Sequence, residues 1–120
     1  MIKVKNIYEL PEVSDGFRVL AERLWPQSLS PESQKVDEWA IELAPSAELE
    51  SWYSFDPDLW EGFQRKYRNE LKHSKRLKDF IEKYKGLSVV TLLFTVSHKT
   101  NNPALILQES LEQTFEDNII

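Results

Sequence analysis

Alternating and continuous runs of apolar residues predict four β-strands in this chain. Residues 2–8, IKVKNIY, alternate apolar and polar positions and carry a lysine pair, which is typical of a strand near a sheet edge. Residues 87–96, LSVVTLLFTV, are apolar almost throughout, as in a strand that is covered on both faces. Residues 17–25 and residues 38–43 are the other two predicted strands, the latter because its apolar side chains are spaced by two.

Apolar residues spaced by three and four positions predict three longer helices. Asp56-Pro57 and Asn102-Pro103 each supply an N-cap residue followed by proline, which marks the start of the first and of the third. Shorter helices are predicted after Ser30 and after Ser46, because serine is a preferred N-cap residue. The predicted buried stripes of the three longer helices are Trp60, Phe63, Tyr67 and Leu71; Leu77, Phe80, Ile81 and Tyr84; and Ala104, Leu107, Leu111 and Phe115.

Strands interleaved with helices predict an α/β fold. We expect residues 1–120 to form a single domain, with a small, mostly parallel sheet of about four strands and helices on both faces. In such sheets ligands bind beyond the carboxyl ends of the strands. The loops that follow Trp25, Leu43 and Val96 are therefore the expected location of a site.

Cysteine is absent, which excludes disulfides, thiolate nucleophiles and zinc–thiolate sites. A cytoplasmic location is the natural expectation for such a chain. No segment reaches the roughly 18 apolar residues of a membrane span, and the N-terminus is too short and polar for a secretory signal, so no membrane association is predicted. The two histidines, His73 and His98, have no metal-ligand spacing, and we expect neither a metal site nor a cofactor.

The net charge of −5 conceals a segregated distribution. Residues 64–85 hold 9 Lys and Arg residues against 3 Asp and Glu residues, while the rest of the chain is strongly acidic. One interpretation is a solvated helix face that is balanced by acidic neighbours. The other is a docking surface for an acidic protein or a nucleic acid. Its candidate residues are Arg65, Lys66, Arg68, Lys72, Lys75 and Arg76.

Glu22 and Arg23 are adjacent charges in the predicted strand 17–25, where alternation directs them to opposite faces. Each then needs a partner, because a buried unpaired charge costs several kcal/mol. Either both are held by neighbouring elements, or both line the strand-end crevice. In the second case Arg23 binds an anion, and Glu22 acts as a base or positions a ligand. Trp25, just before a proline, is a candidate pocket residue.

Three further loop residues have both a structural and a functional interpretation. Ser46 and Asn102 are explained as N-caps, but a helix start also presents N–H groups to an anion. His98 is either a solvated loop residue or a catalytic acid or base. Gln27, beside the predicted crevice, is a candidate for orienting a ligand.

Five blocks of the chain resemble the YeaO-like group of small bacterial and archaeal proteins in domain-of-unknown-function family 488. The resemblance covers roughly residues 2–112 with the blocks in the same order, and it implies a compact α/β domain with a strand at residues 38–43. It implies no established activity. The blocks are SDGFRVLAERLWP, DEWAIELAPSAEL, FQRKYRNEL, VVTLLFTV and NNPALIL.

The chain departs from the family pattern at its polar positions. Residues 22–28 read Glu-Arg-Leu-Trp-Pro-Gln-Ser where the family usually has Asp-Arg-Leu-Trp-Pro-Arg-Gly. Ser97-His98 stand in place of Lys-Asp, and Asn101-Asn102-Pro103 in place of His-Asn-His. One Arg, one Lys and two His of the family's pattern are therefore missing, which argues against a metal- or histidine-based mechanism and favours an altered or degenerate site.

The leading hypothesis is that the chain binds a small anionic ligand at the strand-end crevice. The alternative is a non-catalytic interaction module that docks an acidic protein or a nucleic acid on residues 64–85. The sequence leaves open whether the protein is an enzyme, and it leaves open the oligomeric state.

Overall fold

A computed structural model describes residues 1–26, 29–95 and 101–117. Within these residues a four-stranded parallel sheet has the order β1-β4-β2-β3, which confirms the predicted α/β class. The strands are β1 (Ile2–Asn6), β2 (Phe17–Leu20), β3 (Glu38–Trp39) and β4 (Val90–Phe94). The helices are α1 (Pro31–Gln34), α2 (Ala47–Tyr53), α3 (Trp60–Lys72), α4 (Lys75–Tyr84) and α5 (Pro103–Asp117), with short 3-10 helices at Val13–Asp15, Ile41–Leu43 and Pro57–Leu59.

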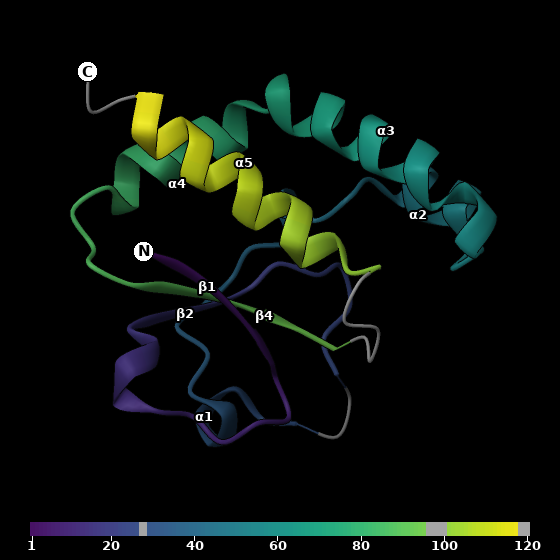
Figure 1. Cartoon of the computed structure of the whole chain (residues 1–120). Coiled ribbons are helices and arrows are strands. Elements are labelled where there is room, and N and C mark those ends of the chain that lie inside the picture. Colours follow the sequence, from purple (N-terminus) through teal and green to yellow (C-terminus); the bar gives the residue numbers. More distant parts are fainter. Residues whose placement is uncertain (27–28, 96–100, 118–120) are drawn as a thin grey trace.

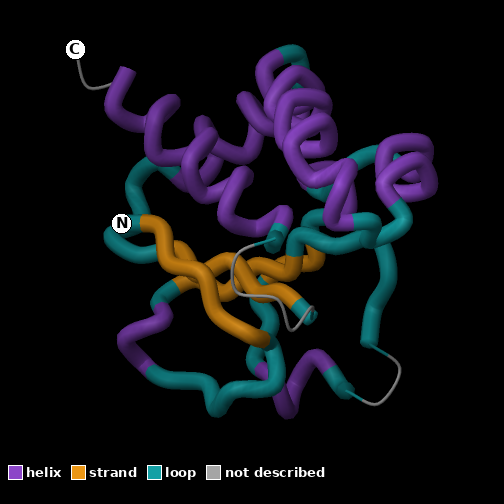
Figure 2. The backbone as a smooth tube through the Cα atoms, turned by 45° about the vertical axis from the view of Figure 1, so that its right-hand side comes forward, coloured by secondary structure: helices purple, strands orange, loops and turns teal. Residues whose placement is uncertain are grey.

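The helices cover the two faces of the sheet unequally. In Figures 1 and 2 the longer helices α2 to α5 lie on one face, whereas α1 and the loops around it lie on the other. β1 and β3 are the edge strands and β4 is internal, in agreement with the pattern of its side chains. The helix-covered face holds the larger core, and the opposite face has a small cluster around Ile7, Leu20 and Leu93.

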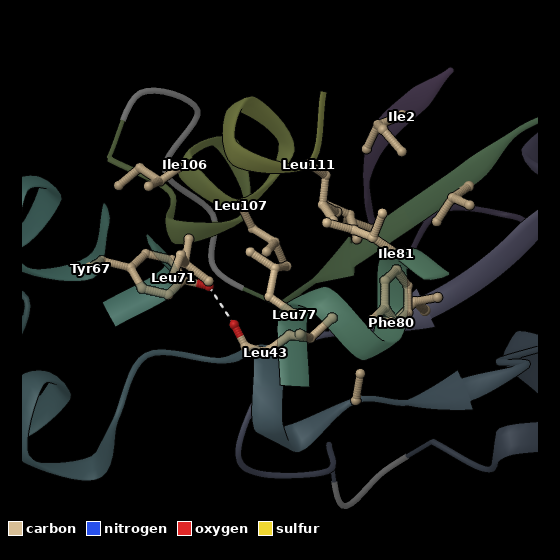
Figure 3. Close-up of a cluster of buried hydrophobic side chains, with 14 of the residues drawn as sticks. Ile2, Leu43, Tyr67, Leu71, Leu77, Phe80, Ile81, Ile106, Leu107 and Leu111 are labelled. Carbon is tan, nitrogen blue, oxygen red and sulfur yellow. Dashed lines mark hydrogen bonds between the residues drawn. The ribbon is translucent and has the colours of Figure 1, made fainter. Parts of the chain in front are cut away.

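The larger core forms where the predicted helix stripes meet the sheet. Figure 3 shows side chains of α3, α4 and α5 that converge on the sheet. The labelled residues of the predicted helix stripes are apolar, with one exception. The exception is Tyr67, which is fully buried, and its hydroxyl donates a 2.6 Å hydrogen bond to the carbonyl of Leu43 (Figure 3). That bond satisfies the phenol inside the core and connects α3 to the segment after β3.

All four strands are shorter in the structure than the sequence indicated, and two of them end well before the predicted position. β2 ends at Leu20 instead of residue 25, because its pairing with β4 and with β3 ends there. The placement of Glu22 and Arg23 on opposite faces of a strand was therefore wrong, since both follow the strand. β3 has two residues and continues into a 3-10 helix, so Trp39 is 41% exposed and is not a core residue.

A buried ionic cluster lies beside the amino-terminal half of the sheet. Arg18 of β2 and Asp15, each 3% exposed, form an ion pair, and Lys5 Nζ lies 3.1 Å from the same carboxylate. The backbone N–H of Glu12 also donates to Asp15 at 3.0 Å. This cluster holds the loop between β1 and β2 against the sheet.

Candidate functional site

A pocket of about 330 Å³ opens at the edge of the sheet where β2 and β4 end. Leu20 of β2 lies beside Leu93 of β4 in the register, so the segments that follow the two strands leave the sheet side by side. The beginning of α5 and residues of α2 and α3 complete the wall. This is the carboxyl edge of a parallel sheet, where α/β folds commonly bind ligands.

The carboxylate of Glu22 connects the segment after β2 to the end of β4. Its Oε1 accepts a hydrogen bond from the backbone N–H of Thr95 at 2.8 Å, and its Oε2 accepts one from the Thr95 hydroxyl at 2.7 Å. Trp39 Nε1 donates to the backbone carbonyl of the same glutamate at 2.7 Å. Both oxygens are thus engaged within the protein, and the arrangement is that of a structural clasp at the rim of the pocket.

Arg23 has the opposite environment. Its side chain is exposed and lines the same pocket, and within the described part of the chain it takes part in no hydrogen bond or ion pair. A guanidinium that makes no hydrogen bond keeps its donors available to a ligand, although Arg23 is near enough to Glu50 to lower the pKa of that carboxyl. Of these two adjacent charged residues, Glu22 is therefore bound within the fold, whereas Arg23 faces the pocket.

Asn102 lies at the inner wall of the pocket and is only 2% exposed. Its Oδ1 accepts a hydrogen bond from the backbone N–H of Ala104 at 2.9 Å, so it caps α5 as the sequence predicted. No hydrogen bond involves its amide nitrogen within residues 1–26, 29–95 and 101–117. Since every buried side-chain nitrogen and oxygen in those residues has a hydrogen-bond partner, this nitrogen is not fully buried and remains accessible from the pocket that Asn102 lines.

Glu50 of α2 is a pocket residue whose place in the sequence indicates only a helix-dipole role. Burial is the main reason that its pKa is raised above the usual range; the charges of Glu22 and Glu70 raise the pKa further, while Arg23 lowers it. In the sequence Glu50 resembles an ordinary acidic residue in the first turn of a helix. Glu50 stands three residues before Tyr53, so the two side chains lie on the same face of α2. Tyr53 also lines the pocket, and this spacing is the sequence feature that could have placed Glu50 there.

Trp25 lies in the pocket wall, where the sequence predicted it. Its indole Nε1 donates to the carbonyl of Leu29 at 2.7 Å, and its ring packs edge-on against Trp39 with 5.5 Å between centroids. These contacts hold the segment after β2 in a defined position. Trp25 therefore presents an apolar surface to the pocket while its polar edge is satisfied elsewhere.

Ser46 does not line the pocket. Its hydroxyl donates to Glu70 at 2.6 Å and accepts from the N–H of Leu49 at 3.1 Å, and its own N–H donates to Glu70 at 2.9 Å. Ser46 thus has the capping role, and its polar groups are used within the fold. Gln27 and His98, the two remaining candidates, lie outside the described residues.

The six basic candidates of α3 and α4 do not form one uniform surface. Arg68 pairs with Glu109 of α5 at 3.0 Å, and Lys66 lies over the ring of Trp52 at 4.9 Å. No ion pair with an acidic side chain involves the others within the described ranges. These are Arg65, Lys72, Lys75 and Arg76, and all are exposed.

Two general features of the described residues concern metals and membranes. The described residues contain no group of three or more acidic or histidine side chains that is placed to hold a metal ion. Across the same ranges, every helix is too short or too polar to cross a bilayer.

Comparisons with known proteins match the chain over nearly its whole length. An uncharacterised protein of Mycobacterium tuberculosis is 34% identical over 110 residues, which is 92% of each chain. The uncharacterised protein YeaO of Escherichia coli is 34% identical over 114 residues, covering 92% of this chain and 96% of YeaO. No solved structure gives a significant match.

A family model described as the inactive DUF488-N3 subclade matches residues 1–119. The match and the two relatives agree with the blocks in which the sequence resembles domain-of-unknown-function family 488, and with the observed α/β sheet. The chain belongs to the DUF488 family and, within it, to the subclade described as inactive.

Proposed function

We propose that this protein binds a small anionic ligand in the pocket at the carboxyl ends of β2 and β4. The observation that carries the proposal is that two donor groups, those of Arg23 and Asn102, line one pocket and have no hydrogen-bond acceptor among the residues that the structure describes. An anion gains charge-assisted hydrogen bonds from a guanidinium, and it also accepts a hydrogen bond from an amide that lines the pocket.

The start of α5 supports an anion for a second reason. Asn102, Pro103 and Ala104 all line the pocket, and they are the residues at which this 15-residue helix begins. The N-terminus of a helix carries a partial positive charge. The helix dipole, the Asn102 amide and Arg23 therefore all favour negative charge at the same place.

Several features favour binding without turnover. Glu22 would be the natural general base of the pocket, but both of its oxygens already accept hydrogen bonds from Thr95. The family model is described as inactive, and the sequence lacks the lysine and the two histidines that the family usually carries. A pocket that retains donors while the carboxylate of Glu22 is engaged within the fold is suited to recognition of an anion.

The first test is a titration of the whole chain with inorganic phosphate, glycerol phosphate and succinate. Binding is measured through the NMR chemical shifts of the backbone amides. We expect saturable shifts in residues 22–28 and 97–103. Unchanged shifts in both segments with all three probes would overturn the proposal.

Two variants sharpen this test because each removes a donor and keeps the fold. Arg23→Gln removes the guanidinium, and Asn102→Asp keeps the capping oxygen while replacing the amide donor by an acceptor. Each should weaken anion binding about tenfold or more, the range for a hydrogen bond to a charged group. Arg76→Gln and Asn69→Asp make the same charge changes on exposed positions of α4 and α3, and should leave binding unchanged.

The alternative, docking of an acidic protein or nucleic acid on residues 64–85, has less support. Arg68 and Lys66 already have intramolecular partners, so the local charge is partly balanced. Nucleic-acid binding on this surface would weaken steeply with salt, through release of counterions. Salt-sensitive binding of DNA or RNA that Arg76→Gln weakens and Arg23→Gln does not would favour this alternative.

A further inference from the structure

We infer that the ligand carries an aromatic ring beside its anionic group, and that this ring lies against Phe55 and Tyr53. The inference rests on the proposed function and specifies the chemical class of the ligand. Its basis is an aromatic wall that extends from the mouth of the pocket to its interior, together with exposed apolar residues around the mouth.

The aromatic wall consists of three ring side chains that all line the pocket. Phe55 and Tyr53 have ring centroids 6.0 Å apart, and Tyr53 and Phe63 have centroids 4.5 Å apart. Phe63 is buried in the core, Tyr53 is 6% exposed and Phe55 is 70% exposed. The rings thus form a continuous series from solvent to core, and aromatic faces attract other aromatic rings beyond what simple burial of area provides.

The mouth of the pocket exposes large apolar side chains from three separate loops. Leu24 is 81% exposed, Phe55 70% and Tyr8 57%, and all three line the same pocket. Single exposed apolar residues are ordinary, but three that surround one opening form a patch, and such patches mark binding sites. A ligand that is only a compact anion would leave this patch in water.

The backbone at Phe55 points to the same conclusion. Ser54 and Phe55 have φ values of +46° and +58°, a left-handed conformation that is disfavoured for residues other than glycine and is uncommon for a bulky side chain. Glycine or asparagine would adopt this turn with less strain. The chain instead places a phenylalanine there, with most of its ring in water. Strain of this kind gathers at sites of function.

The size of the pocket limits the ligand. About 330 Å³ lies at the lower end of the range for small-molecule sites, which is about 300 to 1,000 Å³. This is enough for one ring, or a fused pair, with its anionic group. It is too small to enclose a dinucleotide, so the class is an aromatic carboxylate or an aryl or aryl-bearing monophosphate.

The test compares probes of equal charge that differ in the ring. Phenyl phosphate is titrated against glycerol phosphate, and benzoate against hexanoate, with wild-type protein and backbone NMR shifts as the readout. We expect each aromatic anion to bind at least about threefold tighter than its aliphatic counterpart, which corresponds to one aromatic contact. Shifts should include residues 53–55 for the aromatic anions alone.

The decisive variant is Phe55→Asn, because asparagine tolerates a positive φ and the fold should be retained. It should abolish the preference for the aromatic probes and leave the affinity for glycerol phosphate unchanged. Leu10→Asn is the matched control, since Leu10 is 84% exposed and lies outside the pocket. It should keep the preference.

Three outcomes would overturn the inference, and they are distinguishable. Equal affinity for aromatic and aliphatic anions would remove the aromatic class and leave anion binding in place. Failure of every anion to bind would remove the proposed function as well. A wild-type dimer that Phe55→Asn converts to a monomer would show that the exposed rings form an interface between two copies of this chain.

Discussion

Two arginines five residues apart, Arg18 and Arg23, have opposite environments, and the contrast separates structural charge from available charge. The Arg18 guanidinium is 3% exposed; it pairs with Asp15 and donates to the carbonyls of Gln34 and Lys35 at 2.9 to 3.2 Å. Arg23 is exposed and has no such partner within the described part of the chain. The first arginine holds three segments together, whereas the second leaves its donors facing a pocket.

The comparison also shows what a charge requires when it is buried. Each of the three guanidinium nitrogens of Arg18 has an acceptor, and Asp15 accepts from Glu12 and Lys5 as well. Removing one member of such a set leaves the others buried and uncompensated. Around Arg23 no hydrogen bond or ion pair of the described residues depends on the guanidinium, so its removal should affect binding and not stability.

The largest expected effect is on the buried cluster. Asp15→Asn leaves the buried Arg18 without its carboxylate and leaves Lys5 with Glu12 alone, and it should lower the free energy of unfolding by about 3 to 5 kcal/mol. Urea unfolding followed by tryptophan fluorescence measures the change. Arg23→Gln, on the exposed side of the comparison, should change the same quantity by less than about 0.5 kcal/mol. Equal losses for the two variants would remove the distinction between these arginines.

An intermediate effect is expected at the clasp between the two strand ends. Glu22→Gln replaces a carboxylate oxygen that accepts from Thr95 by a donor, and should cost about 1 to 3 kcal/mol of unfolding free energy. Glu112→Gln, at an exposed position of α5, is the matched control and should be nearly neutral. If Glu22→Gln were also neutral, the carboxylate would have to be assigned a role in binding.

A smaller effect is expected from acid. Burial by itself raises the pKa of Asp15, but the Glu12 N–H, Lys5 and Arg18 together hold that pKa below its usual value. The folded protein therefore binds this proton at lower pH than the unfolded chain does. The contribution of Asp15 is fully present above about pH 4, near the unfolded pKa, and is lost as the pH falls through the folded value. Asp15→Asn should show a shallower decline in stability over that range, and parallel declines would contradict the assignment.

The smallest expected effect concerns the acid beside Arg23. Glu50→Gln removes a negative charge from the pocket and should tighten binding of inorganic phosphate about two- to fivefold, because partly exposed charges interact weakly. The pKa of Glu50 is raised, mainly by burial, so wild-type affinity for an anion that keeps its charge, such as benzenesulfonate, should rise as Glu50 becomes protonated at low pH. Glu50→Gln should lack that rise. Weaker binding by the variant would instead make Glu50 a ligand-binding partner.

The candidate site was only partly predictable. Trp25, Arg23 and Asn102 were found because they follow predicted strands or begin a predicted helix, and such positions can be located from local pattern. Glu50 and Phe55 were missed, since nothing near them in the sequence says that α2 packs beside the strand ends. Ser46 was placed at the correct helix start, yet the position of α3 directs its hydroxyl to Glu70 and away from the pocket.

The amino-acid sequence by itself determined the α/β class, the helix stripes and the caps at Ser46 and Asn102, because side-chain periodicity and capping act over a few neighbouring residues. Tertiary structure alone decided where β2 ends, which of the two arginines is buried, and that Trp39 faces solvent. These features depend on how far the neighbouring strands extend and on which acceptors a distant segment brings. Such long-range pairing is not encoded in the local pattern of any one segment.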